Sequence, residues 1–534
     1  MVSILYVFCS VLTSPFPEHD HFTLEDSRDL EGLAYNFVGS YSRNDLERLV
    51  KMNGLSSPYI LKKKLEHFSD LVDQPYDCCV DSCMAFTGPY SELEKCQICG
   101  EDRYDNRGKP HNIFRYLPLI PRLQAFFKSE RVINMLQYRQ EREPYDGTLR
   151  DVFDSDHFQE LLDTTVKIDG VEYPHKIGES EWDIFVGFTL DGVSLWRGLG
   201  SLKARASTTC WPLAVIIYSF DPKIRTRLEH VFSLGVIPGP HSPKHINSFI
   251  FPFHAEARRG AIGIPTYNAR LDRIFEMHWY PIFGTADMPA LAKANGGKGA
   301  GAVAPCQKCP IKGLRDPTKR YGITYYLPHQ HPGEGEESQT DYLLDNPKTH
   351  QYFKEVWYEL TQAATAAEYK RVGQEHGVTC LPLLGLLPSI NIPNSFPYGL
   401  MHLLFENLAP NMFSHWTGKF KTLEPDHDPY YLDEDTCAII GQETIGCVRT
   451  TPSTMIRAMP DIFLHSTKFT AESWAFWITW LAPYLLQSRL PNRHYQHLLL
   501  LVDIIKMATS LEITQETLEK LDASTRQWHA EYEE

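Results

Sequence analysis

Four cysteines within the first hundred residues have the spacing of a metal site. They read Cys79-x3-Cys83-x12-Cys96-x2-Cys99, which is two close pairs separated by a loop. Four thiolates on two tight turns satisfy the tetrahedral coordination of a structural zinc ion, and the binding free energy then stabilises the fold. We predict zinc here. The alternative is a group of buried free thiols, and Cys78 is a further thiol that could replace Cys79.

A second cysteine pair, Cys306 and Cys309, supplies half of another metal site. Its other ligands must come from elsewhere in the chain, where His402, His376 and Cys380 are available. A redox-active CxxC motif is the alternative, but the Gly-rich approach and the proline that follows do not resemble a strand leading into a thioredoxin helix. The spacing therefore favours zinc.

Three carboxylates could support metal-dependent phosphodiester chemistry. Asp191 follows the apolar run 184–190, Asp287 follows the run 280–286, and Glu406 lies in an apolar helical stretch that we expect to bury it against a sheet. Such a set can hold two Mg2+ ions about 4 Å apart, which activate a nucleophilic oxygen and stabilise the leaving oxygen. From the residues alone this is one grouping among many, because the chain has 67 Asp and Glu and most carboxylates are solvated.

The elements that must position these residues differ along the chain. Polar helices are predicted over 26–70, and the aromatic and β-branched runs 184–190 and 211–218 predict strands of a mixed α/β domain. Helical periodicity returns from 470 to the end. The 534 residues exceed one compact core, so several domains are expected.

We predict four regions with different roles. They are a helical lead-in over 1–70, a zinc-binding module with a basic aromatic segment over 71–150, a catalytic domain over 151–425 with an insertion at about 296–395, and a helical tail domain over 426–534 that the chain end cuts short.

The net charge of the chain restricts where this protein can bind nucleic acid. The formal net charge of -15 argues against a protein that coats DNA over its whole surface, because phosphate neutralisation needs clustered Lys and Arg. The segment 103–139 has the opposite sign, with eight Lys or Arg against two acidic residues. We predict DNA contact there, and the alternative is a packed helix with solvated basic residues. The candidate contacts are Arg103, Arg107, Lys109, Arg115 and Arg122.

Several short blocks recur in one order that is typical of a known family. The first blocks are Asp77–Gly88, Cys96–Gly100 and Phe114–Leu123, and the later ones are Leu190–Val193, Thr209–Leu213, Ala286–Ala290, Pro305–Cys309 and Met401–Asn407. Over about 75–420, the chain resembles the Tnp2-type transposases of CACTA (En/Spm) elements, particularly fungal ones. Several blocks in one order are far more specific than any single motif.

The resemblance implies an RNase H-like catalytic domain of the DDE class. Asp191, Asp287 and Glu406 would be its metal-binding triad, holding Mg2+ or Mn2+ for cleavage of double-stranded DNA at transposon ends and strand transfer to a target. His402 lies one helical turn before Glu406 on the same face. We predict that His402 completes the zinc site of the second cysteine pair.

A DDE-type transposase is therefore the expected function, in a nuclear protein that binds DNA. No stretch approaches the roughly 20 apolar residues of a spanning helix, so no membrane association is expected, and homo-oligomers are possible. The alternative is a catalytically silent, zinc-stabilised DNA-binding or adaptor protein derived from a transposase. An intact triad favours the enzyme, whereas a chain end inside the tail domain favours such a remnant.

Overall fold

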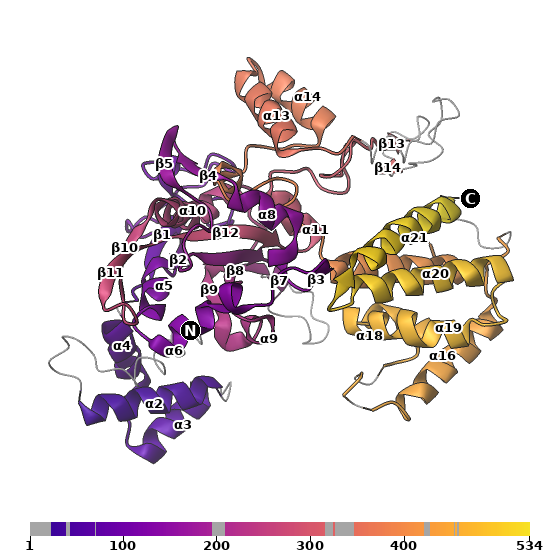
Figure 1. The fold of residues 1–534 in the computed structure, drawn as a ribbon, viewed down its shortest axis with the longest axis horizontal. Coiled ribbons are helices and arrows are strands. Elements are labelled where there is room, and N and C mark those ends of the chain that lie inside the picture. The colour runs from indigo at the N-terminus through magenta and orange to yellow at the C-terminus, as the bar shows by residue number, and fades with distance from the viewer. Residues whose placement is uncertain are drawn as a thin grey trace. The chain divides into compact units, whose positions relative to one another are not determined.

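The computed structural model describes residues 23–38, 43–69, 71–194, 209–315, 324–325, 346–420, 428–452, 454–456 and 459–533. The chain divides into two compact units, each with its own buried core (Figure 1). The sheet unit comprises residues 1–143, 156–308 and 348–397, and the helical unit comprises 144–155, 309–347 and 398–534.

The sheet unit begins with three helices, as predicted for the polar segment 26–70. They are α2 (Leu24–Val38), α3 (Arg43–Asn53) and α4 (Pro58–Ser69). Leu30 and Leu33 of α2 are buried with Leu61 and Leu65 of α4, because leucines three or four residues apart share one face of a helix. The three helices thereby form a small core of their own.

A seven-stranded mixed sheet forms the centre of this unit. Its strands are β1 (Gln74–Cys78), β2 (Asn112–Tyr116), β6 (Ile184–Leu190), β7 (Val193–Ser194), β8 (Thr209–Ile217), β9 (Val231–Ile237) and β12 (Trp279–Thr285). The order is β1-β2-β9-β8-β6-β12, and β7 pairs with β8. This sheet with its helices confirms a mixed α/β fold, and β6 and β8 confirm the strands predicted at 184–190 and 211–218.

Strand directions define the two ends of the sheet. Neighbouring strands are antiparallel throughout, except that β12 runs parallel to β6. Counting across the sheet, β1, β9, β6 and β12 all finish at the same end. We call it the Asp191 end, because Asp191 directly follows β6 there.

Helices cover both faces of the sheet. Phe185 and Phe188 are three residues apart on β6, so their side chains point to opposite faces. Phe185 packs edge-on against Phe158 of α8 (Asp156–Leu162), and Phe188 stacks on Phe253 of α10 (Ile246–Ile262). Nearly every residue of β6 is buried, as expected of a strand covered on both faces.

Smaller elements complete the sheet unit. The helices are α5 (Ile120–Phe126), α6 (Glu130–Leu136), α7 (Tyr138–Glu141), α9 (Pro222–Arg225), α11 (Met288–Ala294), α13 (His350–Gln362) and α14 (Ala366–His376). The outer hairpins are β4 (Thr165–Ile168) with β5 (Val171–Lys176), and β10 (Ile264–Asn268) with β11 (Arg273–Met277).

The helical unit confirms the helical periodicity predicted for the C-terminal region. Its helices include α15 (Ala409–Trp416), α16 (Glu434–Val448), α17 (Ile462–His465), α18 (Ala471–Phe476), α19 (Ala482–Leu485), α20 (Asn492–Ala508) and α21 (Gln515–Glu533), with π-helical turns at η5 (Met401–Leu408) and η8 (Trp477–Leu481). Short strands β3 (Thr148–Leu149) and β15 (Ile513–Thr514) pair with each other, as do β13 (Leu314–Arg315) and β14 (Thr324–Tyr325). Trp474 and Trp477 lie in its core.

None of the helices that the structure describes is both long and apolar enough to cross a membrane.

Candidate functional site

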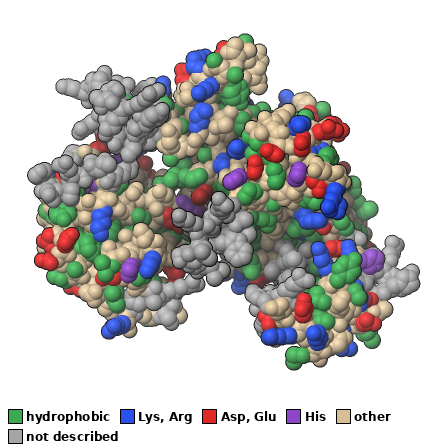
Figure 2. Space-filling model, turned by 180° about the vertical axis from the view of Figure 1, so that it is seen from behind, with side chains coloured by type: hydrophobic (Ala, Val, Ile, Leu, Met, Phe, Trp, Pro, Cys, Tyr) green, Lys and Arg blue, Asp and Glu red, His purple; other side chains and the backbone are tan. Residues whose placement is uncertain are grey.

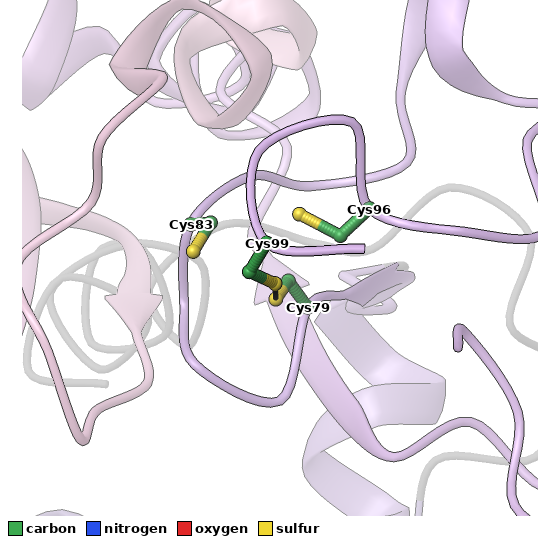
Figure 3. Close-up of side chains that lie close together, drawn as sticks. All are labelled: Cys79, Cys83, Cys96 and Cys99. Carbon is green, nitrogen blue, oxygen red and sulfur yellow. Dashed lines mark hydrogen bonds between the residues drawn. The ribbon is translucent and has the colours of Figure 1, made fainter. Parts of the chain in front are cut away.

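The structure gathers the four predicted cysteine ligands into one cluster. The side chains of Cys79, Cys83, Cys96 and Cys99 point into a common space between two loops (Figure 3). Their sulfur atoms all lie within 4.8 Å of one another, and Cys99 is the one exposed member. Sulfurs that surround a zinc ion at about 2.3 Å are about 3.8 Å apart. The cluster can therefore hold a structural metal such as zinc with little movement.

The two cysteine turns have the same backbone design. The amide of Cys79 donates to the carbonyl of Met84 over 2.9 Å, and the amide of Cys96 donates to the carbonyl of Glu101 over 2.9 Å. Gly100 closes the second turn with a φ of 83°, a left-handed conformation that glycine adopts without steric cost. Each turn presents two thiols to the same point, which explains why the sequence spacing alone predicted that the four cysteines lie together.

Hydrogen bonds and burial act in opposite directions on the thiols. Burial raises the pKa of Cys83 to about 11. Burial also opposes ionisation of Cys96, but the amides of Cys99 and Ile98 donate to its sulfur and lower its pKa overall. Thiolates packed this closely repel one another, so complete deprotonation of the cluster requires a cation among them. The donor set fits zinc.

Arg103, predicted to contact DNA, holds the cysteine loop together. Its guanidinium pairs with the Asp77 carboxylate at 2.7 Å and donates to the carbonyls of Ser91 and Leu93 at 2.6 and 3.2 Å. It also lies 4.9 Å from the ring centroid of Phe86, a cation–π contact. Five donors in a planar fork allow Arg to bridge several chain segments in this way. Its charge is thus engaged within the protein.

Arg122 is likewise used inside the protein. It is 4% exposed and donates to the carbonyls of Leu117, Pro118 and Ser233 over 2.7 to 2.8 Å. Burial lowers the pKa of Arg122 to about 10. A guanidinium in this position does not reach a DNA phosphate, so we correct the prediction and exclude Arg122 from the DNA-binding surface.

The other three basic candidates are exposed. Arg107 and Lys109 lie on the loop that follows the last cysteine, where Asp105 accepts from both of their backbone amides. Arg115 of β2 is exposed and pairs with Asp73 at 2.6 Å. An exposed pair of this kind is weak and exchanges readily. These side chains stay available to a phosphate.

Asp191 and Asp287 follow neighbouring parallel strands in the same register. Thr189 of β6 is aligned with Thr285 of β12, and each aspartate stands two residues beyond its threonine. Asp191 is exposed and accepts from the Gly192 amide at 2.7 Å. Both residues are thus at the Asp191 end of the sheet, as their positions after apolar runs predicted.

Asp287 also begins a helix. One of its carboxylate oxygens accepts the amide of Ala290 at 2.7 Å and caps α11. A capping carboxylate has a second oxygen with its own lone pairs, so this bond does not exclude a metal. The cap fixes the orientation of the carboxylate relative to β12.

The side chains of Trp211 and Lys293 link the residue next to Asp191 with the helix that Asp287 caps. The ring of Trp211, at the start of β8, lies against Gly192, next to Asp191. The Lys293 ammonium lies 5.1 Å from the centroid of that ring. Burial lowers the pKa of Lys293, while the negative charge of Asp287 opposes this shift. Neither the contact of Trp211 with Gly192 nor that of Lys293 with Trp211 was predicted from the sequence, although the block Thr209–Leu213 contains Trp211.

Glu406 belongs to the helical unit and is not buried as expected. Its side chain is 47% exposed, because the buried face of this turn carries Leu404 and Ala409 instead. His402 Nε2 lies 3.7 Å from Glu406 Oε2, which confirms that the two residues share one face. A triad that includes Glu406 remains a prediction.

The second cysteine pair is divided between the two units. Cys306 lies in the sheet unit, where its carbonyl accepts from the Lys348 ammonium at 2.8 Å, and Cys309 lies in the helical unit. Of the available ligands, His376 instead contacts the Tyr352 hydroxyl at 2.7 Å. Within the described ranges, the cluster of Figure 3 is the one group of three or more possible ligands at metal-binding distances. A zinc site at Cys306, Cys309 and His402 remains a prediction.

The middle of the chain matches a known protein family. Residues 146–338 match the model of the transposase family tnp2. This match supports a transposase family, which implies DNA binding. It covers Asp191, Asp287 and the second cysteine pair, but not the first cysteine cluster or Glu406. No curated protein matches the chain.

Proposed function

We propose that this protein is a DNA transposase of the CACTA type that cleaves and joins DNA at a two-metal site. Asp191, Asp287 and Glu406 would hold the metals. The observation that carries the proposal is the register of β6 and β12, which places two aspartates side by side after parallel strands. Carboxylate oxygens are the ligands that Mg2+ prefers. The tnp2 match over residues 146–338 supports the same function.

The strand order supports an RNase H-like fold for the sheet unit. Strands β6, β8 and β9 form an antiparallel meander, and β12 returns beside β6 in parallel after α10. A parallel return beside the first strand brings the ends of those two strands together. This is the arrangement we expect of a DDE catalytic domain.

Residues 389–395 of the sheet unit are hydrogen-bonded to β12. The Ser389 hydroxyl donates to the Pro281 carbonyl at 2.6 Å, and the Ser395 carbonyl accepts from the Gly284 amide at 2.7 Å. Residues 389–395 therefore run along β12 toward the end that carries Asp287. Glu406 follows this segment in the sequence, and we propose it as the third ligand.

In such a site the protein supplies position and charge. Two Mg2+ ions would activate the attacking oxygen and stabilise the leaving oxygen of the phosphodiester. Asp191 and Asp287 would orient them from fixed strand ends, with Asp287 further held by its cap on α11. Both aspartates directly adjoin a strand or a helix, and such elements position side chains more precisely than loops do.

DNA binding would be local, because the protein is acidic as a whole. On the face drawn in Figure 2, Lys and Arg side chains are interspersed with Asp and Glu. Arg107, Lys109 and Arg115 are the exposed members of the predicted basic segment. We propose that they contact phosphates, in a nuclear protein whose zinc ion stabilises the cysteine loop that carries Arg107 and Lys109.

A nicking assay tests this function. Supercoiled plasmid carrying the DNA that flanks the gene is incubated with Mg2+ or Mn2+ and the full chain. Asp287→Asn is the informative variant, because Asn keeps the helix cap and removes the charge. Asp221→Asn is the matched control, since Asp221 caps α9 at the opposite end of the sheet.

We expect nicking by the wild type and by Asp221→Asn, and a loss of at least a hundredfold in Asp287→Asn. Equal nicking by all three proteins would contradict the catalytic assignment. DNA binding without nicking by the wild type would instead favour the silent DNA-binding protein.

A further inference from the structure

The cysteine cluster and the two aspartates are at the same end of one sheet. β1 finishes at Cys78, immediately before the first ligand, and it runs in the same direction as β6 and β12. The loop between β1 and β2 therefore emerges at the same end of the sheet as Asp191 and Asp287, at the edge opposite β12. The zinc-binding loop is an extension of the sheet that carries the carboxylates.

A second loop at this end, residues 238–245, contacts the cysteine cluster. It connects β9, which also finishes at the Asp191 end, to α10. The amides of Lys244 and His245 both donate to the carbonyl of Cys83, at 3.1 and 2.9 Å. The His245 ring packs edge-on against Tyr90 of the cysteine loop with 5.1 Å between centroids. The backbone of Lys244 is thus fixed directly to a zinc ligand.

The other side of the same loop is fixed to the helix that Asp287 caps. Lys293 of α11 donates to the Pro243 carbonyl at 2.9 Å and to the Ser242 hydroxyl at 2.5 Å. The loop therefore lies between the cysteine cluster and α11, with hydrogen bonds to both. Its position depends on the fold of each.

Lys244 itself is exposed at the middle of this arrangement. Within the part of the chain that the structure describes, no carboxylate lies within ion-pair distance of its ammonium. A fixed backbone with a solvated, unpaired ammonium suits a phosphate contact, because a lysine binds phosphate as a point charge and gives up few internal interactions.

We propose that Lys244 binds the DNA backbone between the zinc-binding loop and the carboxylates. Arg107 and Lys109 of the cysteine loop would supply further phosphate contacts. This inference rests on the proposed function, since DNA is the partner that the neighbouring carboxylates would require. It adds a contact outside the basic segment 103–139 and gives the zinc site a role in positioning that contact.

Binding of a fluorescent 30-base-pair duplex to the full, zinc-loaded chain tests the inference. Anisotropy is measured for the wild type, Lys244→Ala and Lys223→Ala over a series of salt concentrations. Lys223 is the matched control, because it is exposed on α9 at the opposite end of the sheet. Zinc content and thermal unfolding show whether each variant keeps its fold.

Lys244→Ala should weaken binding about three- to tenfold and reduce the salt slope by about 0.9, the value for one lost phosphate contact. Lys223→Ala should match the wild type, and Lys244→Arg should retain binding. If the wild type binds DNA and Lys244→Ala binds equally well, the inference is wrong while the proposed function stands. If the wild type binds no DNA, both are wrong.

Discussion

Thr189 in β6 pairs with Thr285 in β12, and each of them stands two residues before an aspartate. This register brings Asp191 and Asp287 to adjacent positions at one end of the sheet. The same end carries the cysteine cluster, because β1 finishes there as well. One sheet thus positions both predicted metal sites.

Replacing one cysteine at a time distinguishes the predicted zinc ligands from a nearby cysteine that does not bind zinc. Cys83→Ser should lose the zinc ion and lower the thermal stability strongly, since structural zinc contributes about 10 kcal/mol or more of binding free energy. Cys78→Ser should retain the zinc, because Cys78 is buried outside the cluster. Metal content by mass spectrometry of the folded chain checks this. Retention of zinc by Cys83→Ser, or its loss from Cys78→Ser, would contradict the ligand assignment.

Arg103 should matter for stability more than for DNA affinity. Arg103→Met removes an ion pair and two hydrogen bonds to carbonyls, and we expect a loss of about 2 kcal/mol of unfolding free energy. Arg107→Met, at an exposed position, should change stability by no more than about 0.5 kcal/mol. Urea unfolding measures both changes. Equal destabilisation by the two variants would show that Arg103 does not hold the loop.

A second pair of arginines should divide in the same way between stability and DNA binding. Arg115→Met should reduce the salt slope of binding by about 0.9, whereas Arg122→Met should leave it unchanged. Arg122→Met should instead destabilise the fold by about 3 kcal/mol, because three buried or partly buried carbonyls lose their donor. Binding is compared at a temperature where both variants are folded. A smaller salt slope in folded Arg122→Met would contradict its structural role.

The sheet unit should lose stability in mild acid. Burial lowers the pKa of His254 in α10 from 6.5 to about 4. The unfolded chain therefore binds a proton that the folded chain excludes between about pH 6.5 and 4, so stability falls as the pH decreases through this window. His254→Leu should flatten that dependence, and exposed His111→Leu should not. Thermal unfolding between pH 4 and 7 measures the slopes, and identical slopes in all three proteins would contradict this account.

Local features of the fold were predictable from the sequence, and long-range ones were not. Spacing identified the cysteine cluster because each pair lies on one tight turn. Apolar runs identified β6 and β8 because strands buried on both faces contain few polar residues. The pairing of β6 with β12 spans about a hundred residues, and no local pattern records it. The contact of Lys244 with Cys83 is equally remote in sequence.

The predictions that needed correction concern side chains with two possible environments. Arg122 stands in a basic segment, yet it is buried among carbonyls. Glu406 stands in an apolar stretch, yet it is exposed, because the buried face of its π-helical turn carries other residues. Charge and hydrophobicity averaged over a segment do not determine which face of an element one residue occupies.

We propose that Asp191 and Asp287 bind divalent metal together. Titration of the full, zinc-loaded chain with Mn2+, followed by electron paramagnetic resonance of the free ion, measures this directly. We expect bound Mn2+ in the wild type and in Asp221→Asn, and at least tenfold weaker binding in both Asp191→Asn and Asp287→Asn. Unchanged Mn2+ binding in these two variants would contradict it.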